Sequence, residues 1–219
     1  DVEEVFLQEG GILQHAKPGA LAIDMTTSSP SLAVRLYEEG KKKGIRVMDA
    51  PVSGGDSGAR NGTLSIMVGG DEADFKEALP LFECMGKNIV HMGGPGYGQH
   101  TKAANQIAVA GATAAYTEAL VYAEKVGLDP NKLLEAIGAG AAGSWQLSNM
   151  APRVLKGDLA PGFFVKHFIK DMKIIKEESE KKGVELDMLN AVLSMYEKMS
   201  EMGLDNEGTQ ALIRYYQDK

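Results

Sequence analysis

The chain has 219 residues, of which 44% are hydrophobic and 24% are charged, a composition typical of a globular protein with a buried core. Its formal net charge of −7 at pH 7 argues against nucleic acid or an anionic membrane as partner, because both require a basic surface. Cys84 is the only cysteine, so no disulfide can form within the chain, and no apolar run approaches the roughly 20 residues that span a bilayer.

The first residues have the pattern of a mid-domain segment, and the chain starts at Asp1 without a methionine. We therefore expect a front portion to precede them, and any targeting sequence would lie there. The single cysteine fits a reducing compartment. We expect a cytoplasmic location, with the mitochondrial matrix as the alternative.

The first half of the chain alternates helix and strand patterns. Ser29 followed by Pro30 predicts a helix start, Gly44 ends that helix, and Asp71 is expected to cap the next long one. Short apolar or alternating runs predict strands, and the order strand, helix, strand implies parallel strands with a crossover helix. The expected helices are at residues 1–14, interrupted by Gly10 and Gly11, and at residues 30–43 and 72–83. The expected strands are at residues 21–25, 45–48, 63–68 and 88–92.

From Gly98 onward the pattern predicts only helices. The segment to about Val126 is expected to form one helix, about 40 Å long at a rise of 1.5 Å per residue. This change in composition places a domain boundary near residue 96, between an α/β part at residues 1–95 and an all-helical part at residues 96–219. The further expected helices are at residues 130–139, 144–155, 165–182, 187–202 and 208–216.

Residues 93–105 read Gly-Gly-Pro-Gly-Tyr-Gly-Gln-His-Thr-Lys-Ala-Ala-Asn. Glycines and a proline forbid regular structure up to about Gly98, and at the helix start that follows, unpaired backbone N–H groups favour anions. Lys102 and Asn105 are three apart and share one helix face. There the lysine can supply charge and a proton to an oxygen that is becoming an alkoxide, and the asparagine can orient it. The alternative is an ordinary helix with a solvated lysine.

Two further segments follow predicted strands. Residues 49–55 read Asp-Ala-Pro-Val-Ser-Gly-Gly, and the Ser-Gly-Gly part can present successive backbone N–H groups to a carboxylate. Its alternative role is a plain surface loop. Thr26 and Thr27 follow the first predicted strand, where open α/β sheets bind their ligands. Their alternative role is a helix-capping cluster.

Together these segments resemble the β-hydroxyacid dehydrogenase family, which includes 3-hydroxyisobutyrate dehydrogenase and tartronate semialdehyde reductase. In that family the D-A-P-V-S-G-G segment binds substrate, and a G-x-G-x-x-x-K-x-x-N segment, here residues 96–105, carries the catalytic lysine. A third match is Lys170-Asp171-Met172, similar to the family's K-D-hydrophobic segment on a late helix. The resemblance covers essentially the whole chain. One departure is that the family opens with a glycine-rich dinucleotide fingerprint, which this chain does not contain.

The resemblance implies an α/β fold class: the remainder of a Rossmann-type dinucleotide-binding domain, then a long interdomain helix and an all-α domain. It implies an oxidoreductase that transfers a hydride between a nicotinamide cofactor, NAD or NADP with NAD slightly preferred, and a short β-hydroxy acid or its semialdehyde. Lys102 would be the catalytic acid or base. The implied substrate-binding residues are Ser53, Gly54, Gly55, Asn105 and Phe163, and the implied cofactor-binding residues are Thr27, Lys170 and Asp171.

Several alternatives stand beside these roles. By charge alone, Lys170 and Asp171 are a solvated pair on a charged helix face, and Phe163 is equally a core aromatic residue. Related 6-phosphogluconate dehydrogenases carry K-x-x-H-N where this chain has alanine before Asn105, and imine reductases replace the lysine. The alternative function is that of a non-catalytic relative acting as a binding or assembly module.

The remaining expectations concern cofactor and partners. The four histidines have no metal-ligand spacing with one another or with Cys84, so no metal is expected. The expected partners are a small carboxylate substrate and, because of the small-residue helix and the apolar helical half, a second copy or more in a dimer or tetramer. Without the turn that takes the pyrophosphate, we expect this chain alone to bind cofactor weakly or not at all.

Overall fold

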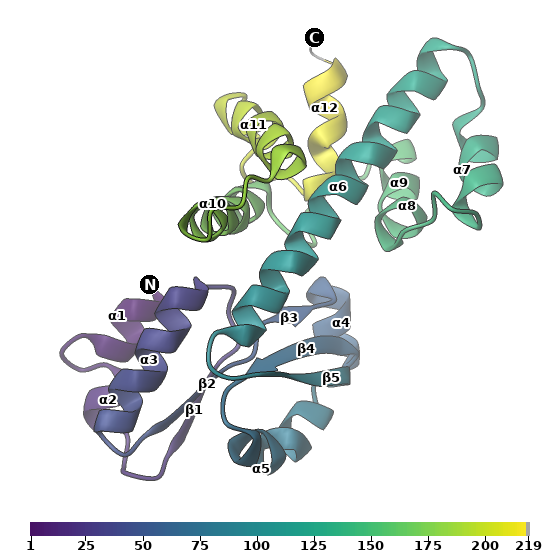
Figure 1. The fold of residues 1–219 in the computed structure, drawn as a ribbon. Helices are drawn as coiled ribbons and strands as arrows, with labels where there is room; N and C mark the ends of the chain where they lie inside the picture. Colours follow the sequence, from purple (N-terminus) through teal and green to yellow (C-terminus); the bar gives the residue numbers. More distant parts are fainter. Residues whose placement is uncertain (218–219) are drawn as a thin grey trace. The chain divides into compact units, whose positions relative to one another are not determined.

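The computed structural model describes residues 1–217 of the chain. They form two compact units, of which the first spans Asp1–Ala104 and the second begins at Asn105. A single long helix, α6 (Tyr97–Lys125), runs through this division, as predicted (Figure 1). The domain boundary near residue 96 stays a prediction.

The first unit is an α/β structure built on one sheet. Strands β1 and β2 are parallel, with Ile23 opposite Met48, and α3 connects them, which confirms the predicted strand–helix–strand order. Strand β4 is parallel to β5 and antiparallel to β3, and it meets β2 at Asp49 and Gly69. The elements of this unit are α1 (Val2–Leu7), α2 (Ile12–His15), β1 (Leu21–Asp24), α3 (Pro30–Lys42), β2 (Arg46–Asp49), β3 (Val52–Ser53), α4 (Gly55–Asn61), β4 (Leu64–Gly69), α5 (Glu72–Glu83) and β5 (Gly86–Gly93).

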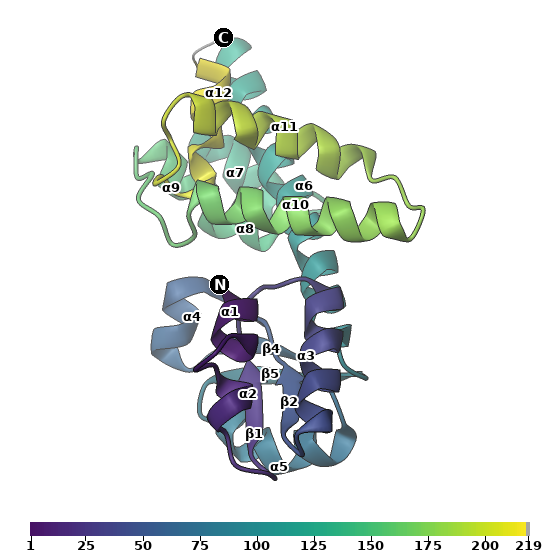
Figure 2. The ribbon, with the colours of Figure 1, turned by 90° about the vertical axis from the view of Figure 1, so that its left-hand side faces the viewer.

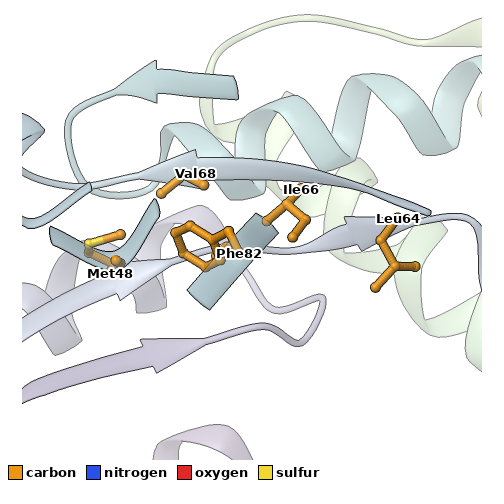
Figure 3. Packing of buried hydrophobic residues seen from close by; sticks show 7 residues of the cluster. Met48, Leu64, Ile66, Val68 and Phe82 are labelled. Atoms are coloured by element: carbon orange, nitrogen blue, oxygen red, sulfur yellow. The ribbon is translucent and has the colours of Figure 1, made fainter. Parts of the chain in front are cut away.

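Helices cover both faces of this sheet (Figures 1 and 2). Successive residues of β2 point to opposite faces, and apolar residues on each face pack against helices. Val47 packs with Phe6 of α1 and Leu36 of α3. Its neighbour Met48 packs on the other face with Phe82 of α5. Figure 3 shows the labelled side chains of this second core, which are Met48, Leu64, Ile66, Val68 and Phe82. This layering is the Rossmann-type arrangement that the family resemblance implies.

The two predicted helix caps of this unit differ. Ser29 caps α3, since its Oγ accepts a hydrogen bond from the backbone N–H of Leu32 at 3.1 Å, and Pro30 opens the helix. Asp71 stands just before α5, but its carboxylate accepts hydrogen bonds from the Tyr37 hydroxyl at 3.0 and 3.1 Å and makes no cap bond. Asp71 is therefore the N-cap residue of α5, as predicted, but its side chain does not cap the helix, because the Tyr37 hydroxyl occupies the carboxylate.

The sequence pattern does not predict β3 or α4. Strand β3 has two residues, too few for an alternation to show. Helix α4 contains Gly58, and glycine disfavours helix interiors. Gly58 is buried against Leu64, whose Cδ2 would stand 3.2 Å from an added Cβ. Close packing therefore outweighs propensity here.

The second unit is helical over its described residues, and Phe164 and Gly208 form an isolated β-bridge. Helices α10 and α11 lie side by side, and the ring of Phe168 meets that of Tyr196 edge to face at 5.1 Å (Figure 2). In the described part of the chain, none of the helices combines the length and the apolar character that crossing a membrane requires. Beyond α6, its elements are α7 (Pro130–Gly138), α8 (Trp145–Asn149), α9 (Ala151–Leu155), α10 (Val165–Lys181), α11 (Asp187–Glu201), the 3₁₀-helix η1 (Thr209–Ala211) and α12 (Leu212–Gln217).

Two predicted helices of this unit need correction. The helix expected at residues 144–155 is two helices that meet at Met150, because Pro152 lacks an N–H group and its ring obstructs the preceding turn. The helix expected at residues 208–216 starts with the tighter 3₁₀ geometry of η1 before it continues as α12.

Candidate active site

A buried carboxylate holds the start of α6. Asp49 ends β2 and is 3% exposed; its Oδ1 accepts a hydrogen bond from the N–H of Gly96 and its Oδ2 one from that of Gln99, both at 2.8 Å. Burial raises the pKa of the Asp49 carboxyl, the two N–H groups oppose that rise, and the charge of Asp24 adds to it. The carboxyl group that meets the N–H groups at the start of α6 is therefore supplied by the chain itself.

Two glycines allow this close approach. A Cβ on Gly98 would collide with the backbone oxygen of Met67 and stand 2.7 Å from that of Asp49. A Cβ on Gly69 would stand 2.6 Å from Oδ1 of Asp49 and 2.7 Å from the N atom of Gly98. Backbone atoms cannot move aside as a flexible side chain can, so glycine is required at both positions for reasons of space.

Lys102 lies one helical turn after Gln99 and is 7% exposed. Its Nζ donates a hydrogen bond of 2.8 Å to the backbone oxygen of Val52, the residue directly before Ser53. The alternative of a solvated surface lysine is thus excluded. The structure brings the ammonium group to the segment that also carries the predicted carboxylate-binding residues.

The segment Thr26–Ser28 is held from two sides. Asp24 accepts a hydrogen bond from the backbone N–H of Thr26 at 2.9 Å and another from the Ser28 hydroxyl at 3.1 Å. Gln99 donates from Nε2 to the backbone oxygen of Thr26 at 2.8 Å and accepts from the N–H of Ser28 at 3.1 Å. Thr27, the predicted cofactor contact, lies between these attachment points and is half-buried.

Ser53, Gly54 and Gly55 join β3 to α4. Ser53 is half-buried and the two glycines are exposed. Gly54 has a φ of +133° and Gly55 a φ of +61°, which side-chain-bearing residues rarely adopt. The turn therefore depends on glycine, and its exposed backbone can approach an anion closely.

In the second unit, a chain of hydrogen bonds starts at Asn105. Its Nδ2 donates to Oε1 of Gln106 at 2.8 Å, and Nε2 of Gln106 donates to Oδ2 of Asp171 at 2.7 Å. Asp171 is 2% exposed, so the alternative of a solvated Asp171 is wrong. Lys170 is half-exposed, and its Nζ lies 3.1 Å from Oδ1 of Asp171. This burial favours Asp171 as a support for Gln106 over a direct cofactor contact.

Phe163 is half-buried before α10. Its ring meets that of Phe168 edge to face at 5.7 Å, and its backbone oxygen accepts a hydrogen bond from the N–H of Thr209. These contacts fit its alternative role as a packing residue. Its predicted role in closing the substrate pocket stays a prediction.

Sequence reasoning missed the roles of Asp49, Gln99 and Gln106. A signal for the two glutamines was available, because with Lys102 they recur at spacings of three and four along an alanine-rich helix, which puts all three on one stripe. All three are buried. For Asp49 the signal was a carboxylate at the end of a buried apolar strand, where an unpaired charge is costly.

The residues after β1 fit a nicotinamide cofactor. Thr26 is exposed and Thr27 half-buried at the carboxyl end of a parallel strand, where sheets of this class bind dinucleotides, and their backbone is held in advance. Within residues 1–217, no group of three or more His, Cys, Asp or Glu side chains is arranged to hold a metal ion.

Comparison with known proteins covers both parts of the chain. Residues 1–94 match a family model described as the NAD binding domain of 6-phosphogluconate dehydrogenase. Residues 96–216 match one described as NAD-binding of NADP-dependent 3-hydroxyisobutyrate dehydrogenase.

Individual relatives agree with these matches. An uncharacterized oxidoreductase of Bacillus subtilis, YkwC, is 52% identical over 99% of this chain and 75% of its own length. The 2-hydroxy-3-oxopropionate reductase of Escherichia coli is 43% identical over 82% of this chain and 61% of its own length. Among solved structures, 3-hydroxyisobutyrate dehydrogenase from Salmonella typhimurium superimposes with a TM-score of 0.87 at 27% identity, over 97% of this chain and 74% of that one.

Proposed function

Because the chain belongs to the 3-hydroxyisobutyrate dehydrogenase family of NAD(P)-binding oxidoreductases, we propose that it interconverts a short β-hydroxy acid and its semialdehyde. The observation that carries this proposal is the buried Lys102, whose Nζ lies 2.8 Å from the backbone oxygen of Val52. An ammonium group in that position stands beside a turn suited to a carboxylate. The substrate class therefore combines a carboxylate with a nearby hydroxyl or aldehyde.

The turn at Ser53, Gly54 and Gly55 would bind the substrate carboxylate. Its exposed glycines adopt positive φ angles, which lets backbone N–H groups approach an anion without interference from a Cβ. A bound carboxylate at this turn would place the neighbouring carbon atoms of a short acid toward Lys102. Substrate length would then be limited by the distance between the turn and the lysine.

Lys102 would act as the proton donor and acceptor. In the reductive direction its ammonium group gives a proton to the aldehyde oxygen while the carbonyl carbon receives the hydride, and the oxygen becomes a hydroxyl. In the oxidative direction the neutral amine takes the hydroxyl proton. Asn105 is three residues further on the same helix and would orient the reacting oxygen.

A nicotinamide cofactor, when bound, supplies or accepts the hydride. Thr27 would contact it from the end of β1, and Lys170 from α10. We propose NAD as the slightly preferred form. The buried Asp171 would position two residues without touching the cofactor itself. It accepts a hydrogen bond from Gln106 and pairs with Lys170.

The test is absorbance loss of NADH and of NADPH, measured separately on the full-length protein with a panel of short semialdehydes that carry a carboxylate. We expect turnover, and we expect Lys102→Ala to lower kcat by about 10²–10⁴-fold, the usual contribution of a positioned acid–base residue. The matched control is Lys87→Ala, which removes an exposed lysine of β5 and should leave kcat unchanged. Equal thermal stability of the two variants separates lost chemistry from lost folding.

The competing hypothesis is a non-catalytic relative that serves in binding or assembly. Cofactor binding without turnover on any substrate of the panel would favour it and contradict the proposed activity. Turnover that survives in Lys102→Ala would instead keep the reaction class and remove Lys102 from its role.

A further inference from the structure

Gln99 is a buried polar residue in the first turn of α6, the helix that carries Lys102. It is 1% exposed, so it cannot itself touch a bound cofactor or substrate without rearrangement. Both polar atoms of its side chain are engaged by backbone, Nε2 with the oxygen of Thr26 and Oε1 with the N–H of Ser28. These two attachment points flank Thr27 on either side.

The backbone of Gln99 is hydrogen-bonded as well as its side chain. Its N–H donates to Oδ2 of Asp49 at 2.8 Å, and Asp49 also accepts from Gly96. Asp49 lies opposite Asp24 in the β1–β2 pairing. Asp24 in turn accepts hydrogen bonds from the backbone N–H of Thr26 and from the Ser28 hydroxyl. The segment after β1 and the first turn of α6 are therefore joined through one buried hydrogen-bonded cluster.

We propose that Gln99 is a positioning residue for the cofactor: it sets the backbone around Thr27 relative to the first turn of α6, three residues before Lys102. This inference rests on the proposed role of Thr27 in cofactor contact. Its consequence is that cofactor affinity depends on a buried side chain located 72 residues after Thr27, outside any dinucleotide-binding loop. A bidentate carboxamide is suited to this task because it fills one donor and one acceptor of the backbone at once.

The first experiment uses Gln99→Met in the full-length protein, since methionine keeps the length of the side chain and removes both hydrogen bonds. The readouts are the dissociation constants of NADH and NADPH from fluorescence titration, and the thermal midpoint. Loss of two hydrogen bonds that hold the contact segment should weaken cofactor binding roughly tenfold. If the proposed role of Thr27 holds, Thr27→Val should weaken it as well, and the double variant should be little weaker than Thr27→Val alone.

The matched control is Gln210→Met in the helical unit. Gln210 is also 1% exposed, and its Nε2 donates to two backbone oxygens, of Asp158 at 3.2 Å and of Ala160 at 2.9 Å. Both methionine variants should lower the thermal midpoint. Only Gln99→Met should change the cofactor dissociation constant, while Gln210→Met should stay within about twofold of wild type.

A second variant keeps the proposal testable if Gln99→Met does not fold. In Gln99→Glu, a protonated carboxyl can still donate to Thr26 and accept from Ser28, whereas the ionised form loses the donor and adds a third buried carboxylate beside Asp24 and Asp49. The ratio of its cofactor dissociation constant to that of wild type should therefore shrink as the pH is lowered from 8 toward about 5.

Two results would overturn the inference. One is an unchanged cofactor dissociation constant in a folded Gln99→Met, and the other is a Gln99→Glu to wild-type ratio that does not depend on pH. Either would leave the proposed function intact if wild type turns over its substrate and Lys102→Ala does not. Failure of the proposed function has a different signature, because wild type itself would then show no turnover with any semialdehyde.

Discussion

Two segments of the α/β unit are the candidates for ligand contact, and they are held in different ways. Thr26–Ser28 is fastened by side chains from elsewhere in the chain, Asp24 at its base and Gln99 on α6. Ser53–Gly55 is shaped by its own glycine conformations and lies mostly exposed. The first segment can be disturbed by distant substitutions, whereas the second responds mainly to changes within itself.

This difference matches what each segment is proposed to bind. A segment that contacts a cofactor binds more tightly when its backbone is already fixed, because less conformational freedom is then lost on binding. A turn that receives a variable carboxylate needs close backbone approach more than it needs buried partners. The predictions below test this contrast, from the largest expected effect to the smallest.

The largest effect is expected from Gly98→Ala. The added Cβ would collide with backbone oxygens of Met67 and Asp49, so we expect a loss of about 3 kcal/mol in the free energy of unfolding, as for an overpacked core. Denaturant unfolding followed by circular dichroism measures it. The control is Gly94→Ala in the preceding turn, where an added Cβ meets no atom within 4 Å. Equal stability of the two variants would contradict this account of the start of α6.

Asp49→Asn should cost about 2 kcal/mol in the free energy of unfolding, because an amide offers one acceptor where two backbone N–H groups need one each. The measurement is again denaturant unfolding. The control, Asp56→Asn, removes an exposed carboxylate that pairs with Arg60 across one turn of α4, and should cost less than about 0.5 kcal/mol. A similar cost in both variants would show that Asp49 does not hold α6.

Gly54→Ala should cost between about 1 and 2 kcal/mol, because alanine is strained at a φ of +133°. Its diagnostic effect is a raised KM for the carboxylate substrate, measured by steady-state kinetics. Gly19→Ala is the control: Gly19 also has a positive φ of +82°, with no atom within 4 Å of an added Cβ. It should lose stability and keep KM. A KM raised equally in both variants would argue against carboxylate binding at this turn.

Ser28→Ala should lower stability by about 1 kcal/mol, because it removes a buried hydrogen bond to Asp24. Near the Ser53–Gly55 turn, Ser57→Ala removes an exposed hydroxyl that lies 3.4 Å from the backbone oxygen of Gly54. This variant should change the free energy of unfolding by less than about 0.5 kcal/mol. Thermal unfolding of the two variants gives the comparison. If Ser57→Ala proved the more damaging, the contrast between a fastened and an exposed segment would be wrong.

The smallest effect is a pH dependence of stability. Burial raises the pKa of Asp49 above its ordinary value, so the folded chain binds this proton more tightly than the unfolded chain. Stability from this group is therefore present at low pH and is lost as the pH rises through the folded-state pKa. The stability advantage of wild type over Asp49→Asn should be larger near pH 4 than at pH 7, and an advantage that grows with pH would refute the assigned direction.

Local signals in the sequence were sufficient for most of the fold. Ser29 with Pro30 determined the start of α3, because a cap depends on residues within one turn. The strand–helix–strand order determined the parallel pairing of β1 with β2. Local signals failed where a partner lay far along the chain, as for Asp71 and Tyr37, or where packing outweighed propensity, as in α4.

The sequence by itself also determined which residue types the site would use: a lysine and an asparagine one turn apart, and a serine followed by two glycines. Only the tertiary structure decided which group accepts the hydrogen bonds at the start of α6, because Asp49 lies about 50 residues before that helix in the sequence. It also decided that Gln99 spans to Thr26 and Ser28. The spacing of polar residues along a helix can indicate which of them share a face, but it does not identify hydrogen-bond partners that are distant in the sequence, because those bonds form only when the chain has folded.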